Sequence, residues 1–144
     1  MSDYYLHAGL PQPVATPLDE PYWSALRENE LKIQRCISCG GWQWGPEWIC
    51  HRCHGDALEF ANVAAEGVLY SYERVWHPVH PALAEQGAYL VGLVELPQAD
   101  NVRVVGNILG DPQQQVTIGA PVRGVFEHHE DAERPYTLLH WELR

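Results

Sequence analysis

Basic residues are scarce in this 144-residue chain, which has nine basic side chains, one of them a lysine, against 19 acidic ones. The formal net charge of −10 repels phosphate backbones at long range, which argues against nucleic-acid binding. No apolar segment approaches the roughly 20 residues that cross a bilayer, so no membrane span is expected. The sequence also lacks a Gly-x-Ser-x-Gly motif and a glycine-rich phosphate loop before a helix. It therefore gives no signature of a serine hydrolase or of a phosphate-binding loop.

The length fits one domain, or a small module joined to a compact one. The hydrophobic content of 46% is typical of a globular protein with a buried core. The first residues form neither a basic stretch nor an apolar run, so nothing indicates export. We therefore expect a cytoplasmic protein, in a compartment where thiols stay reduced and can bind metal.

The cysteines have the spacing of a zinc ribbon, with two Cys-x-x-Cys pairs separated by ten residues: Cys36, Cys39, Cys50 and Cys53. Each pair can direct two thiolates to one point, and two pairs complete the tetrahedral sulfur shell of Zn²⁺. Glycines next to the pairs, Gly40, Gly41 and Gly55, suit tight turns. Four sulfur ligands leave no open position for water, so the predicted ion, one per chain, is structural. The alternative is two disulfides or free thiols, the former being typical of small secreted proteins.

Elsewhere the pattern is mainly β. Residues 1–18 are rich in proline and predict an extended arm, whereas Asp19-Glu20-Pro21 has the acidic cap and early proline of a helix start. Residues 31–35 alternate apolar and polar side chains, as a strand does. We expect three parts: 1–35 with the arm, helix and leading strand, 36–60 with the zinc ribbon, and 61–144 with a barrel.

Five segments after the ribbon are rich in strand formers and are separated by Gly, Pro, Asn or Asp: 68–76, 89–96, 102–109, 121–127 and 136–143. Five short strands with glycine-rich bends predict a small Greek-key barrel of the OB type. A plain β-sandwich is the alternative, because spacing alone does not distinguish the two.

The order of these motifs resembles a particular family. The string Leu31-x-Ile33-Gln34-Arg35-Cys36-x-x-Cys39-Gly40 follows a helix, and His80-Pro81-Ala82, Gly106-Asn107 and Ile118-Gly119-Ala120-Pro121-Val122 come later. Together they resemble small OB-fold proteins with an N-terminal helix and a rubredoxin-like zinc ribbon, associated with acyl-CoA metabolism and long catalogued as a domain of unknown function. The resemblance covers about residues 20–127.

This resemblance implies an accessory subunit rather than an independent enzyme. Members bind thiolase-fold partners: thiolases, lipid-transfer-protein-like thiolases, aldolases of steroid side-chain degradation and some acyltransferases. The partner holds the catalytic groups, while the small subunit shapes the acyl or CoA channel and stabilises the complex. We expect a hetero-oligomer with two copies of each chain and acyl-CoA as its ligand.

Three sets of side chains are candidates for these roles. Trp42, Trp44 and Trp48 crowd a ribbon with little core of its own, so they either face a partner or pack against the barrel and helix. His77 and His80, in a proline-stiffened loop between two strands, could line a shared channel. The candidates for CoA phosphates are the cations around the helix and ribbon: Arg27, Lys32, Arg35 and Arg52. His128-His129-Glu130-Asp131 is interpreted as a solvated turn.

A nucleic-acid-binding module is the competing function, because zinc ribbons and OB barrels both serve it. Tyr70, Tyr72 and Trp76 would supply aromatic side chains for base stacking. The shortage of lysine and the acidic net charge argue against it. An independent lyase or hydrolase is a third possibility, for which the sequence offers no recognisable catalytic set.

Overall fold

The computed structural model describes residues 4–6 and 9–144. Helix α1 (Glu20–Arg27) comes directly after the N-terminal arm, and Pro21 lies in its first turn. Asp19 occupies the N-cap position but makes no side-chain cap bond; its carboxylate accepts instead from the Thr16 N–H at 2.6 Å. The helix buries one apolar stripe, which includes Leu26.

The ribbon is a small antiparallel sheet of β1 (Leu31–Cys36), β2 (Trp42–Gln43) and β3 (Leu58–Val63), in the order β2-β1-β3. Leu31 and Ile33 of β1 are fully buried, which explains why the segment alternates. β1 thus confirms the leading strand and belongs to the same sheet as β2 and β3. The domain limits at 35/36 and 60/61 stay a prediction.

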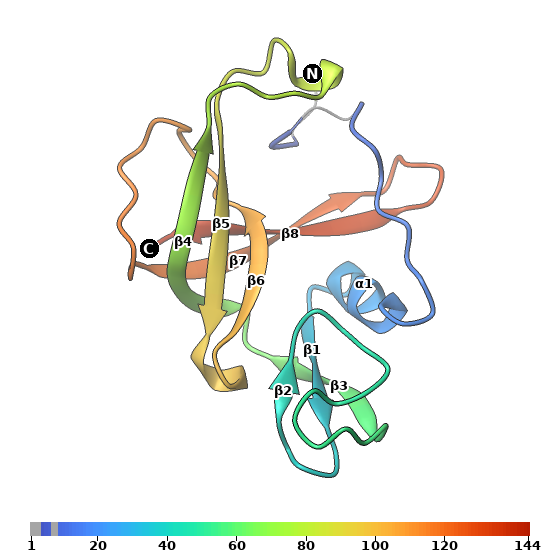
Figure 1. The fold of residues 1–144 in the computed structure, drawn as a ribbon. Coiled ribbons are helices and arrows are strands. Elements are labelled where there is room, and N and C mark those ends of the chain that lie inside the picture. The colour runs from blue at the N-terminus through green and yellow to red at the C-terminus, as the bar shows by residue number, and fades with distance from the viewer. Residues whose placement is uncertain (1–3, 7–8) are drawn as a thin grey trace.

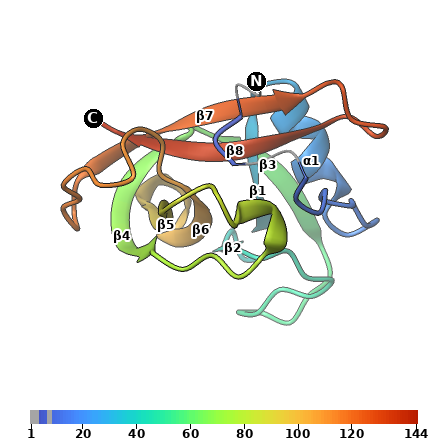
Figure 2. The ribbon, with the colours of Figure 1, turned by 90° about the horizontal axis from the view of Figure 1, so that it is seen from above.

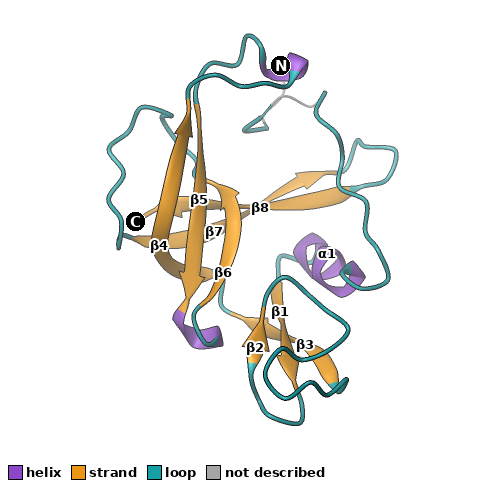
Figure 3. Ribbon diagram, in the orientation of Figure 1, coloured by secondary structure: helices purple, strands orange, loops and turns teal. Residues whose placement is uncertain are grey.

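The rest of the described chain forms a nearly closed five-stranded barrel (Figures 1 and 3). Its strands are β4 (Glu66–Val75), β5 (Tyr89–Leu96), β6 (Val102–Asn107), β7 (Pro121–His129) and β8 (Tyr136–Leu143). Their order is β6-β5-β4-β7-β8, and a parallel bridge between Ile108 and Trp141 brings the two ends together. This mainly β architecture, with one short helix and a barrel after the ribbon, confirms the predicted fold class.

Two 3-10 turns lie in the connections between barrel strands. A 3-10 turn, η1 (Pro81–Leu83), lies between β4 and β5, and η2 (Pro97–Ala99) lies in the β5–β6 hairpin. The barrel closes where Trp141 packs over Gly106, since a Cβ there would lie 2.7 Å from the indole. Only glycine accommodates that approach.

Helix α1 joins the two sheets, because it contacts β1 of the ribbon and β8 of the barrel (Figure 2). Tyr22 and Leu26 of the helix, together with Ile33 of the ribbon, share one hydrophobic core with the barrel's Leu90 and Trp141. Ribbon, helix and barrel are therefore one packed unit. Among the residues described, no helix has the length and apolar character needed to span a bilayer.

Candidate metal centre and partner-facing residues

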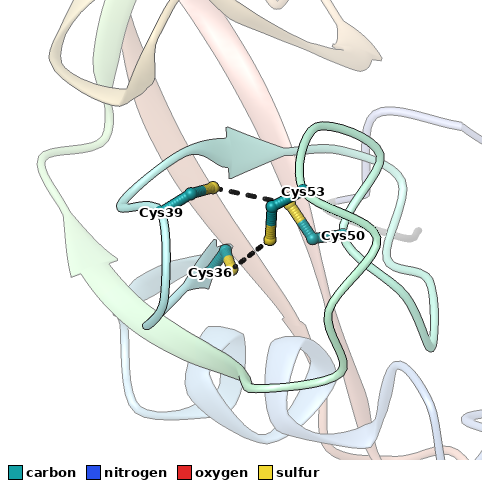
Figure 4. Close-up of side chains that lie close together, drawn as sticks. All are labelled: Cys36, Cys39, Cys50 and Cys53. Carbon is teal, nitrogen blue, oxygen red and sulfur yellow. Dashed lines mark hydrogen bonds between the residues drawn. The ribbon is translucent and has the colours of Figure 1, made fainter.

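The four cysteines converge at the ribbon tip (Figure 4). Their sulfur atoms all lie within 4.8 Å of one another, and the Cys36–Cys53 and Cys39–Cys50 Sγ pairs are each 3.6 Å apart. A disulfide needs about 2.05 Å, so the thiols are free, whereas a tetrahedron of 2.3 Å Zn–S bonds has edges of roughly 3.8 Å. The geometry fits a structural zinc ion and not the disulfide alternative.

The two knuckles repeat one hydrogen-bond pattern. Cys36 N–H donates to the Gly41 carbonyl at 2.8 Å, and Cys50 N–H donates to the Gly55 carbonyl at the same distance. The residue after each second cysteine has a positive φ, +75° at Gly40 and +61° at His54. We expected Gly55 to serve the second turn; the left-handed position is instead held by His54, a residue type that tolerates it better than most.

Backbone N–H groups prepare two of the four sulfurs, those of Cys36 and Cys50, for metal. The N–H groups of Cys53 and Arg52 point at Cys50 Sγ and lower the pKa of that thiol to about 6. The N–H of Cys39 likewise lowers the pKa of Cys36. Because the thiolate is the form that binds metal, these amides favour the ligating state.

A pair of buried glutamines, Gln34 and Gln43, supports the second knuckle. Gln34 accepts from Gln43 Nε2 at 2.7 Å and from Glu47 N–H at 3.0 Å, and its own amide donates to the Glu47 carbonyl at 2.8 Å. Gln43 accepts from His51 N–H at 3.0 Å. The two amides thus tie the loop before Cys50 to β1 and β2. The sequence analysis did not predict that Gln34 and Gln43 support the second knuckle. Their position as polar residues close to a cysteine motif was the signal that could have indicated this role.

The three ribbon tryptophans have different environments. Trp42 and Trp44 are half-buried and pack against the core, Trp44 lying 4.7 Å from the Tyr22 ring between centroids. Trp48 is 65% exposed, as are its neighbour Ile49 at 54% and Ile37 at 63%. Trp42 and Trp44 therefore pack within the chain, whereas Trp48 is exposed and its contact with a partner stays a prediction.

The four candidate cations do not form one cluster. Arg35 stacks over Trp42 at 5.2 Å and Arg52 pairs with Asp100 at 3.4 Å, both beside the Gly40-Gly41 turn. Lys32 lies half-buried on β1. Arg27 is elsewhere, on α1, where it pairs with Glu130 at 3.4 Å.

The β4–β5 loop carries the two candidate histidines. His77 is exposed. His80 caps η1, because its Nδ1 accepts the Ala82 N–H at 3.1 Å, and this leaves Nε2 as the protonated nitrogen of a neutral ring. His80 is thus held in place, while Val79 between them is 99% exposed. The channel role of His77 and His80 stays a prediction.

The expectation of a solvated turn at 128–131 was wrong for His129. This side chain is 5% exposed and stacks between Tyr4 at 3.8 Å and Tyr136 at 4.4 Å between ring centroids. Its Nε2 lies 2.7 Å from Glu127 Oε1. The folded-back arm buries it, and nothing near His129 in the sequence signals that contact.

Glu127 is the centre of this cluster, beside a small cavity of about 80 Å³ under the arm. His140 Nε2 lies 3.0 Å from its second oxygen, and Tyr5 N–H donates to it at 2.9 Å. Burial raises the pKa of Glu127, but the hydrogen bonds of His140, Tyr5 and His129 outweigh it and lower the pKa to about 2. The carboxylate is therefore ionised at neutral pH and anchors the arm.

A helix, a four-cysteine ribbon and an OB barrel sharing one core define a zinc-ribbon OB-fold protein. Two family models match the chain: the ChsH2 rubredoxin-like zinc ribbon domain over residues 23–59 and the ChsH2 C-terminal OB-fold domain over residues 61–127. The chain belongs to this ChsH2 family, which confirms the resemblance inferred from the motifs.

Two curated relatives bear the names of hydratase alpha subunits. The chain is 34% identical over 105 residues to a probable enoyl-CoA hydratase alpha subunit of Thermomonospora curvata, covering 72% of this chain and 32% of that protein. It is 25% identical over 121 residues to the 3-oxo-4,17-pregnadiene-20-carboxyl-CoA hydratase alpha subunit of Mycobacterium tuberculosis, covering 84% and 36%. The chain thus spans about a third of the length of these relatives.

Two solved structures have the same fold. A chain of the Ltp2-ChsH2(DUF35) aldolase matches with a TM-score of 0.75 and 29% identity, covering 92% of this chain and 98% of that one. A DUF35-family protein of unknown function from Sulfolobus solfataricus matches with a TM-score of 0.62 over 90% of this chain and 87% of that one. At 15% identity the second match concerns the fold alone.

Proposed function

We propose that this chain is a non-catalytic accessory subunit of a thiolase-fold, lipid-transfer-protein-like enzyme that acts on an acyl-CoA. The observation that carries the proposal is the match over 98% of a chain from the Ltp2-ChsH2(DUF35) aldolase, in which a ChsH2 domain accompanies a second protein. The names of the curated relatives, alpha subunits of CoA-thioester hydratases, agree with an acyl-CoA substrate.

The buried polar cluster supports a non-catalytic role. Glu127 and His140 are the kind of pair that performs acid–base chemistry, yet their cavity measures about 80 Å³. Pockets for drug-sized ligands begin at roughly 300 Å³, so an acyl-CoA does not fit there. In this proposal the partner holds the reacting groups, and this chain stabilises the complex and contributes to the channel wall.

The ribbon is the docking surface in this proposal. Trp48 and Ile49 sit on a loop held by Gln34 and the second knuckle, so their exposed side chains are presented on a rigid support. Exposed large apolar residues on such a support are typical of protein interfaces. Zinc then acts indirectly, by fixing the shape of the docking surface.

Nucleic-acid binding has less support. The ring of Tyr70, an expected stacking platform, is covered on one face by the Arg103 guanidinium at 3.7 Å. Arg103 also pairs with Glu95 at 3.2 Å, so this cation is engaged within the protein.

Co-expression with a thiolase-like protein from the same genome tests the proposal. We expect a stable hetero-oligomer with two copies of each chain, and partner activity on acyl-CoA that requires this subunit. Trp48→Ser should weaken the complex by at least tenfold in Kd, since buried interface tryptophans often contribute 2 kcal/mol or more. Ile118→Ser, which removes an apolar side chain of similar exposure from the barrel, is the control. A partner that binds and works equally well with Trp48→Ser refutes the ribbon as the docking surface.

A further inference from the structure

The N-terminal arm passes near α1 and the hairpin that joins β7 to β8 (Figure 1). A second, larger hollow is lined by residues of these three segments. Its volume is about 250 Å³, three times that of the cavity beside Glu127. Its walls come from three segments distant in the sequence: Pro13 to Ala15 of the arm, α1, and Arg134 to Tyr136 of the hairpin. The folded chain therefore builds this pocket.

One wall is an ordered stripe along α1. Glu20, Trp23 and Arg27 are spaced i, i+3 and i+7, so they share a helix face about 10 Å long. An anionic acceptor stands at one end, a large aromatic side chain in the middle and a cationic donor at the other end. The stripe thus favours an elongated ligand with a different chemistry at each end.

The opposite wall adds a second guanidinium, Arg134. Arg134 is exposed and makes no ion pair or hydrogen bond with any residue that the structure describes. Arg27 pairs with Glu130 at 3.4 Å, but the two side chains are 46% and 60% exposed, and such surface pairs contribute little. Two guanidinium groups at one pocket, of which only Arg27 has a partner among the described residues and that in a surface pair, indicate an anion in a chain of net charge −10.

We propose that this pocket binds a phosphorylated purine nucleoside. The phosphate meets Arg27 and Arg134, the base packs on Trp23, and an exocyclic amine donates to Glu20. Inorganic phosphate alone leaves Trp23 unused and meets the repulsion of Glu20. The volume of about 250 Å³ is far too small for a whole CoA thioester. The proposal that a nucleotide binds here depends only on residues of this chain. The proposal that CoA supplies this nucleotide depends on the function proposed above.

Calorimetric titration of the zinc-loaded chain tests the site. The probes are 3′-phosphoadenosine 5′-diphosphate, which is the nucleotide end of CoA, together with ADP, adenosine, pantetheine and inorganic phosphate. We expect the two phosphorylated nucleosides to bind, adenosine to bind at least tenfold more weakly, and pantetheine not to bind. Arg27→Gln and Arg134→Gln should each weaken nucleotide binding roughly tenfold, as loss of a charge-assisted hydrogen bond does.

Arg123→Gln is the matched control, because Arg123 pairs with Glu142 on the barrel, away from the pocket lining. It removes the same charge and should leave binding unchanged. Three results would overturn the proposal. Inorganic phosphate could bind as tightly as the nucleotides do, all three variants could weaken nucleotide binding equally, or the wild-type chain could bind no nucleotide. ADP binding as tightly as the 3′-phosphorylated probe supports the pocket but assigns it to free nucleotides rather than CoA. Since the titration needs no partner, its outcome is independent of whether the accessory-subunit function holds.

Discussion

Gln34→Met, which keeps an unbranched side chain of similar length, is predicted to destabilise the protein at the ribbon. The wild-type amide makes three hydrogen bonds, with Gln43 at 2.7 Å and with the Glu47 N–H and carbonyl at 3.0 and 2.8 Å. Each contributes about 1 kcal/mol net, so the expected loss in the free energy of unfolding is about 3 kcal/mol. The thioether replaces none of these bonds.

The assay is urea unfolding at constant zinc, paired with the rate of zinc transfer to a chromogenic chelator. Because Gln34 and Gln43 brace the chain on both sides of Cys50, zinc should leave the variant faster than the wild type. Gln115→Met, at an exposed position, is the control and should change the free energy by less than about 0.5 kcal/mol. A loss below 1 kcal/mol with unchanged zinc release refutes the role given to Gln34.

Three further perturbations probe the metal, the arm and the barrel closure. Chelation of zinc, or Cys50→Ser, should unfold the ribbon. Metal analysis measures the loss of zinc, and near-UV circular dichroism detects the unfolding. A metal-free chain with an unchanged spectrum would contradict a structural role of the ion. The depressed pKa of Glu127, about 2 against 4.5, stabilises the fold above pH 4.5, and this contribution of about 3 kcal/mol is lost as pH falls toward 2. Glu127→Gln should flatten that pH dependence in denaturant titrations, and a variant as acid-sensitive as the wild type counts against the cluster. Gly106→Ala places a methyl group 2.7 Å from Trp141 and should cost about 3 kcal/mol by thermal unfolding; an unchanged melting temperature refutes the tight closure.

Much of the secondary structure followed from local chemistry, although β2 and β3 of the ribbon were not predicted as strands. Pro21 predicted the start of α1, and Leu31 with Ile33 predicted β1 by their alternation. The cysteine spacing predicted the ribbon tip, because ligand geometry restricts the spacing of a zinc knuckle. These features depend on residues that are close in sequence, so the sequence alone was sufficient.

What the sequence did not predict depends on contacts between distant segments. His129 is buried because Tyr4 stacks on it from the other end of the chain. Trp44 and Trp48 are four residues apart in the same loop, yet only one of them faces α1. The pocket of Arg27 and Arg134 joins residues more than 100 positions apart. No local pattern encodes such pairs, so periodicity and composition did not reveal them.

Affinity purification of the tagged chain from its native host tests the central claim most directly. The eluate is analysed by native mass spectrometry for partners and stoichiometry and by elemental analysis for zinc. An accessory subunit predicts a thiolase-like protein in equal amount, in a complex with two copies of each chain and one zinc per copy of this chain. Recovery of the zinc-loaded chain alone, or bound to nucleic acid, contradicts it.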